Sequence, residues 1–170
     1  MSNESNQEFA LPPTGAYKVD TAASKISFAT RHLFGLGAVH GVFPIRSGTV
    51  QVTDPVAGSN VRVEIDAAGV NSANPGRDKK VRAKSLLDTA NHPTIVFSAG
   101  VGEGSTLTGT LTVRDVTRPL TLQVRELSVQ QGTFTARATT TVDRYEFGVL
   151  GMKGLAARML DLTVEVHCTL

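Results

Sequence analysis

Apolar and polar residues alternate along most of this chain, with a repeat of two residues. In residues 60–66, Val61, Val63 and Ile65 share one parity, and charged side chains lie between them. Because successive side chains of a β-strand point to opposite faces, this pattern indicates strands with one buried and one wet face. It recurs, with a more continuous apolar run at 94–101, in residues 26–30, 39–45, 50–52, 107–113, 120–125, 134–142 and 160–168. We therefore predict an all-β fold of eight to ten antiparallel strands, in a barrel or a sandwich.

The composition agrees with many strands joined by turns. The 170 residues include 20 valines and 20 threonines, whose branched β-carbons favour extended backbone, and 16 glycines that break the chain at short intervals. A chain of this length fits one domain, which we assign to residues 15–170. Residues 1–14 are polar and contain prolines, and we predict that they form a flexible N-terminal tail.

One segment departs from the strand pattern. Asn74-Pro75-Gly76 combines a helix N-cap residue with a proline suited to the first helical position. Asn91-His92-Pro93 ends the segment, because a residue before proline avoids the helical region. We therefore predict a short helical insertion near residues 75–91, which would cover one opening of a barrel.

Charge and hydropathy exclude several classes of partner. Lysine and arginine number 17 and aspartate and glutamate 15, a net charge of +2, so we expect no nucleic-acid partner. No stretch is long and apolar enough for an integral membrane segment. The first residues lack a signal-peptide pattern, so we expect a cytoplasmic protein.

Motifs for catalysis, cofactors or metals are missing from the sequence. The one cysteine, Cys168, excludes an internal disulfide and a thiolate metal site, and its place on the apolar parity of the last strand predicts a buried thiol. The four histidines have no metal-ligand spacing. There is neither a nucleophile elbow nor a nucleotide-binding glycine motif. We assign no catalytic residue, metal or cofactor.

Two features leave alternatives open. Gly41, Gly109, Ala136 and Ala138 are small residues at inward positions, which indicates either a ligand cavity or tight sheet packing. Residues 77–84 hold five cations, which form either a solvated helix face or an anion site.

Several segments resemble the YceI-like domain. The most specific match is Gly109-Thr110-Leu111-Thr112-Val113 followed by Val116-Thr117-Arg118-Pro119-Leu120. Further matches, in the same order and spacing, are Tyr17-Lys18-Val19-Asp20, Arg31-His32, Gly41-Val42-Phe43, Arg77-Asp78, His92-Pro93-Thr94-Ile95-Val96-Phe97, Arg144-Tyr145-Glu146-Phe147-Gly148 and Val164-Glu165-Val166. The resemblance covers residues 15–170.

This resemblance implies a lipocalin-like barrel of about eight strands with a long apolar cavity. It implies binding of a polyisoprenoid, an isoprenoid quinone or another long-chain lipid, in a carrier or sequestration role and without known catalysis. Parity, pattern and resemblance together select the candidate ligand-binding residues Phe28, Phe43, Val63, Ile65, Leu87, Phe97, Leu111, Leu122, Phe134 and Phe147. Arg77 and Arg82 are the candidates for holding a head group, because their planar guanidinium groups bind an anion at two points.

Two other functions remain open from sequence. An enzyme acting on a hydrophobic or lipid substrate would need polar groups such as His32, His40 or Arg144 to converge on one pocket. A stress or interaction module would have an interior filled by its own side chains. The sequence does not decide between a monomer and a homodimer.

Overall fold

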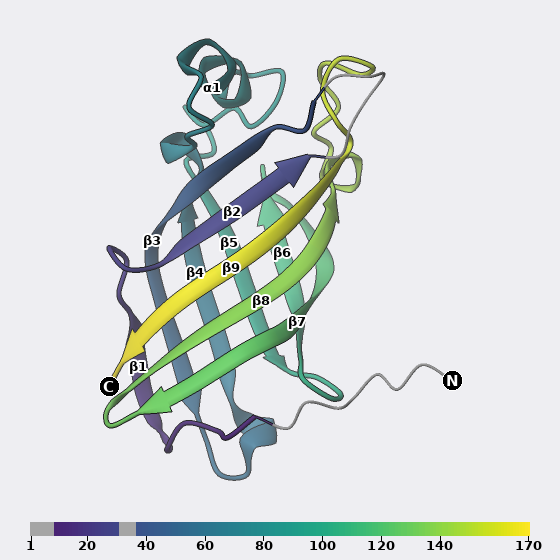
Figure 1. Ribbon diagram of the computed structural model, residues 1–170. Helices are drawn as coiled ribbons and strands as arrows, with labels where there is room; N and C mark the ends of the chain where they lie inside the picture. The colour runs from purple at the N-terminus through teal and green to yellow at the C-terminus, as the bar shows by residue number, and fades with distance from the viewer. Residues whose placement is uncertain (1–8, 31–36) are drawn as a thin grey trace.

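The alternating segments form strands that pair antiparallel around a closed barrel (Figure 1). The computed structural model describes residues 9–30 and 37–170. Within them the strands are β1 (Gly15–Val19), β2 (Lys25–Thr30), β3 (His40–Val52), β4 (Asn60–Asp66), β5 (Thr94–Val101), β6 (Thr106–Val113), β7 (Val116–Gln130), β8 (Thr133–Asp143) and β9 (Met159–Thr169). The predicted all-β, lipocalin-like barrel is confirmed. Arg31 and His32, which the resemblance included, lie outside the described residues.

The barrel has eight strand positions because β1 and β2 share one of them. Both strands lie between β3 and β9: β1 pairs with residues 49–52 of β3, and β2 with residues 40–44. The other neighbours follow chain order from β3 to β9. Every strand contributes to one cluster of buried apolar side chains inside the barrel.

Bulges in the two longest strands change which parity faces inward. In β3 the pairing register with β4 shifts between Ile45 and Ser47. A bulge adds one residue to a strand, so the inward positions move from odd numbers such as Ile45 to even numbers such as Val50 and Val52. A similar shift in β7, between Val124 and Glu126, keeps the extended strand facing the interior.

The predicted insertion is present between β4 and β5. Helix α1 (Pro75–Arg82) begins as expected, since the Asn74 side chain accepts a hydrogen bond from the Arg77 backbone N–H at 3.0 Å. Residues 83–91 form turns rather than more helix. Short 3₁₀ helices lie at η1 (Val56–Gly58), η2 (Ala67–Gly69) and η3 (Arg144–Phe147). Among the described residues, no helix has the length and apolar character needed to cross a bilayer.

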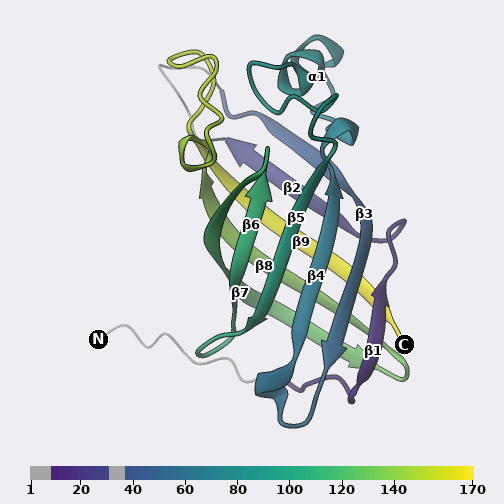
Figure 2. The same cartoon turned by 180° about the vertical axis from the view of Figure 1, so that it is seen from behind.

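Helix α1 lies at one end of the barrel, beside the loop of residues 148–158 (Figures 1 and 2). We call this the helix end. Residues 9–14 and the β5–β6 turn lie at the opposite end, which we call the tail end (Figure 2). The two ends differ in the charge of their residues and in the segments that lie over them: α1 and the loop of residues 148–158 at the helix end, and residues 9–14 at the tail end.

Candidate ligand-binding cavity

The barrel interior contains two cavities, one toward each end. The tail-end cavity has a volume of about 620 Å³ and the helix-end cavity about 600 Å³. Both volumes fall in the range of small-molecule binding sites. Four apolar residues line both cavities: Ile26, Ile65, Leu111 and Leu162. These four residues, which we call the waist, mark where the cavities meet.

All ten predicted ligand-binding residues line this interior. The tail-end cavity is lined by Val63, Phe97, Leu122 and Phe134, and the helix-end cavity by Phe28, Phe43, Leu87 and Phe147. Ile65 and Leu111 belong to the waist. Contact with a bound ligand stays a prediction for each of them.

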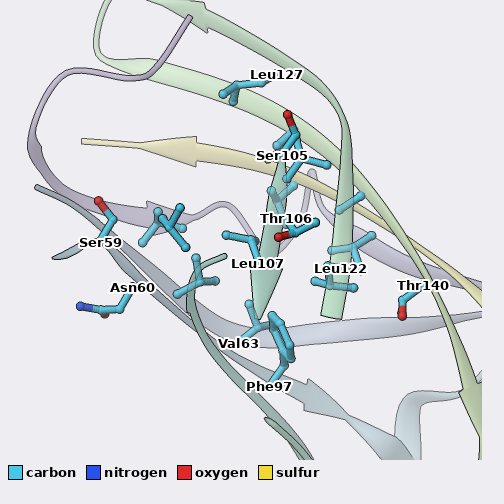
Figure 3. A pocket seen from close by; sticks show the side chains of 18 of the residues that line it. Ser59, Asn60, Val63, Phe97, Ser105, Thr106, Leu107, Leu122, Leu127 and Thr140 are labelled. Atoms are coloured by element: carbon cyan, nitrogen blue, oxygen red, sulfur yellow. The ribbon is translucent and has the colours of Figure 1, made fainter. Parts of the chain in front are cut away.

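The tail-end cavity has apolar walls from several strands. Figure 3 shows Val63, Phe97, Leu107 and Leu122 projecting into the same space. These residues come from β4, β5, β6 and β7, and each sits at an inward position of its strand. A ligand here would therefore contact mainly hydrocarbon.

Small inward residues contribute to the hollow interior in two different ways. The Phe28 ring fills the space beside Gly41, and a methyl group on Gly109 would collide with the Ser98 carbonyl oxygen on β5. The glycines therefore allow tight packing. Ala136 and Ala138, by contrast, line the tail-end cavity and leave it open. The filled interior required by the interaction-module hypothesis is not what the structure shows.

The chain preceding β1 contributes to the tail-end cavity. Phe9, Leu11 and Pro12 are among its lining residues. Tyr17 anchors this segment, because its hydroxyl donates a hydrogen bond to the Pro13 carbonyl at 2.8 Å. Flexibility of residues 1–14 stays a prediction, and residues 1–8 lie outside the described residues.

Among the described residues, charged side chains line the helix-end cavity but not the tail-end cavity. Arg77 and Lys80 of α1 are among its lining residues, whereas Arg82 is not. Residues 77 and 80 are about 60° apart around a helix, but residues 77 and 82 are about 140° apart. Accordingly, the Arg82 guanidinium lies 3.4 Å from the Ala68 carbonyl. Arg77 of the predicted pair therefore lines the cavity and Arg82 does not, and contact of either with a head group stays a prediction.

A buried carboxylate holds Arg77 in place. Asp78 accepts hydrogen bonds from the Ser72 hydroxyl and backbone N–H, and the bond from the hydroxyl is the main cause that lowers the pKa of Asp78. The Ser72 hydroxyl oxygen in turn accepts a bond from Arg77 Nε at 2.9 Å. The Asp78 carboxylate is therefore buried, whereas Lys79 and Lys80 on the same helix are exposed.

A second buried charge shapes the loop of residues 148–158. The Arg144 guanidinium donates hydrogen bonds to four carbonyls of this loop, those of Val149, Gly151, Ala156 and Ala157. Burial lowers the pKa of this guanidinium, although arginine keeps its charge in proteins. Arg144 therefore holds the loop in place, and it also lines the helix-end cavity.

The polar convergence needed by the enzyme hypothesis is not formed by the residues described. Of the three candidates, Arg144 lines the helix-end cavity but is bonded to the loop, His40 is exposed and lines neither cavity, and His32 lies outside the described residues. Cys168 is fully buried, and burial raises its pKa to about 12, so its thiol stays protonated at neutral pH.

Sequence reasoning missed several residues at the helix end. Lys80, Val149, Met152 and Leu155 line the cavity there. Three of them belong to a loop that has no period of two or of 3.6. The nearest signal is its glycine content, at positions 148, 151 and 154, which marks a loop but not its contacts.

Known proteins resemble this chain in sequence and in fold. Protein YceI of Escherichia coli O17:K52:H18 is 26% identical over 163 residues, covering 89% of this chain and 85% of its own. The crystal structure of BcnA from Burkholderia cenocepacia superposes with a TM-score of 0.72 at 20% identity, covering 89% of this chain and 99% of that one. A polyisoprenoid binding domain from Saccharophagus degradans superposes with a TM-score of 0.68 at 14% identity, covering 90% and 97%.

At these identities the two solved structures show a shared fold. The family itself is shown by sequence, because the model of the YceI-like domain matches residues 17–170, nearly the whole described barrel. This chain belongs to the YceI-like domain family.

Proposed function

We propose that this protein binds one long-chain isoprenoid lipid, with its chain running along the barrel through both cavities, and acts as its carrier or store. The observation that carries the proposal is the pair of cavities that meet at the apolar waist. A compact ligand would need one cavity, whereas a slender chain can occupy two that lie end to end.

Energetics and relatives support an apolar chain as the ligand. Each buried methylene contributes about 0.8 kcal/mol, so a chain of isoprene units gains affinity without any polar partner. The related fold from Saccharophagus degradans is described as a polyisoprenoid binding domain.

The head group would lie at the helix end. Arg77 and Lys80 line the helix-end cavity, while the polar residues lining the tail-end cavity, such as Ser59, Asn60 and Thr106, are uncharged. An anionic phosphate gains charge-assisted hydrogen bonds only beside the cations. Lys80 therefore replaces Arg82 in the pair that we assign to the head group.

The first test is mass spectrometry of the lipids extracted from purified protein, followed by titration with polyprenyl compounds. We expect one isoprenoid bound per chain. An empty extract together with no binding on titration would contradict the proposal.

The second test concerns the head group. Arg77→Gln with Lys80→Gln should weaken a polyprenyl phosphate by about 1–3 kcal/mol, the range of hydrogen bonds to charged groups. The matched control Arg82→Gln should have little effect. A quinone with a tail of equal length should bind both variants alike, and equal loss for both ligands would remove the head-group assignment.

A further inference from the structure

The outer surface of the insertion carries positive charge alone. Five cations lie between residues 77 and 84. The two carboxylates in residues 74–93 are turned inward: Asp78 is 6% exposed and bonded to Ser72, and Asp88 is 8% exposed and accepts hydrogen bonds from the Asn91 amide. Because both carboxylates are buried, the charged groups that this segment presents to an approaching partner are cations.

Two exposed leucines lie beside this positive surface. Leu155 is 72% exposed and Leu150 is 46% exposed. Their loop packs against the insertion, since a methyl group on Gly151 would collide with the Ser85 carbonyl. Arg144 holds the backbone of the same loop by four hydrogen bonds.

We propose that the helix end is a docking surface for an anionic lipid bilayer, formed by Lys79, Lys84, Leu150 and Leu155. Basic residues next to exposed apolar side chains are the combination that binds membrane surfaces: the cations attract lipid phosphates, and the apolar side chains enter the acyl boundary. The partner is chosen by charge, because an apolar patch bordered by lysines complements an anionic surface.

The other charged side chains at the helix end include acidic residues, but they leave the surface around the insertion positively charged. Asp115, on the β6–β7 turn, is an exposed anion whose carboxylate lies 3.3 Å from the His92 ring. Asp143 is bonded to Arg158, and the exposed Glu146 follows it on η3. Lys153, in the same loop as the leucines, adds a further exposed cation.

The docking surface borders the helix-end cavity through Leu155. Leu155, Arg77 and Lys80 all line that cavity. If the barrel holds an isoprenoid as proposed above, docking would let the chain pass between bilayer and barrel without crossing water. This consequence rests on the proposed function, whereas the docking itself does not.

The experiment is co-sedimentation of the full chain with vesicles. We expect binding to vesicles of equal parts phosphatidylcholine and phosphatidylglycerol, and weak binding to phosphatidylcholine alone. Binding should fall as salt rises from about 0.01 M to about 1 M, where the screening length drops from roughly 30 Å to 3 Å.

Charge variants test which surface binds. Lys79→Gln with Lys84→Gln should weaken binding about 25-fold, at roughly fivefold for each basic residue near the membrane. The matched control is Lys18→Gln with Lys25→Gln, which removes the same charge from exposed positions on β1 and β2 and should leave binding unchanged.

Leucine variants test the apolar contact. Leu155→Ser should weaken binding about tenfold, whereas Leu170→Ser, at a residue 68% exposed near the C-terminus, should not. Equal loss in the matched controls, no vesicle binding, or equal binding to neutral vesicles would overturn the proposal. Measurements on lipid-extracted protein keep the two proposals separate, because vesicle binding without isoprenoid binding would leave docking intact and remove the carrier role.

Discussion

Blocking the waist should make the barrel select short chains over long ones. Leu111 lies on β6, is 6% exposed, and lines both cavities. In Leu111→Trp the indole ring would occupy the passage between Ile26, Ile65 and Leu162. The helix-end cavity would remain for a short ligand, and the tail-end cavity would be closed to it.

The loss of affinity depends on how many isoprene units can no longer enter the tail-end cavity. An isoprene unit has five carbons, and a drug-sized ligand gains about 0.3 kcal/mol per heavy atom, so each excluded unit costs about 1.5 kcal/mol. That is roughly a tenfold loss of affinity for each unit. With the interior volume divided almost equally between the cavities, at about 620 and 600 Å³, a chain that fills both loses about half of its buried units.

The assay is calorimetric titration with geranyl and long polyprenyl compounds that carry the same head group. We expect Leu111→Trp to weaken the long chain by at least about 100-fold, for two excluded units, and to change geranyl binding little. Leu111→Met is the control, because a swap that conserves volume costs under about 1.5 kcal/mol. Thermal unfolding of each variant checks that the barrel is intact.

The result that would refute this reasoning is an equal loss for both ligands. It would mean that the chain does not pass the waist, or that the cavities are not used in sequence. Unchanged binding of the long chain would refute it as well.

Three further predictions concern stability. Arg144→Leu should lower the free energy of unfolding by about 3 kcal/mol, because buried carbonyls lose a charged donor. It should also expose residues 148–158 to proteases. Urea unfolding measures the first effect and limited proteolysis the second, and a loop that resists proteolysis would contradict the role assigned to Arg144. Asp78→Asn should destabilise the protein at neutral pH but not in strong acid. The pKa of Asp78 is lowered from its ordinary 3.8, so its stabilisation is present above that value and is lost as pH falls through the depressed pKa; urea unfolding across pH tests this, and a cost independent of pH would contradict it. Gly109→Ala should lower the free energy of unfolding by about 1–3 kcal/mol, because the added methyl group would collide with the Ser98 carbonyl. Gly76→Ala, where the nearest atom would lie 3.6 Å away, should be tolerated. Thermal unfolding compares the two variants, and equal stability would refute the packing argument.

The sequence by itself determined most of the strands, the inward parity of their regular stretches and the start of the helix. These features depend on neighbouring residues alone: side chains alternate across any strand, as at Val61, Val63 and Ile65, and a cap needs only Asn74 followed by Pro75. This alternation, together with the resemblance to the YceI-like domain, selected the ten apolar candidates, and all ten line the interior.

What only the tertiary structure decided depends on residues distant in the chain. From the sequence, Gly109 could form a cavity wall or allow tight sheet packing. Its close contact with β5 in the structure shows that it allows packing. Whether Arg82 or Lys80 reaches the opening depends on how α1 sits over the barrel, and the role of Arg144 depends on carbonyls up to 13 residues later. The register shift at Ile45 likewise appears only in pairing with β4. The alternation of side chains is a local property of a strand. The size of the cavities and the positions of the charged side chains depend instead on which residues face one another once the barrel has closed.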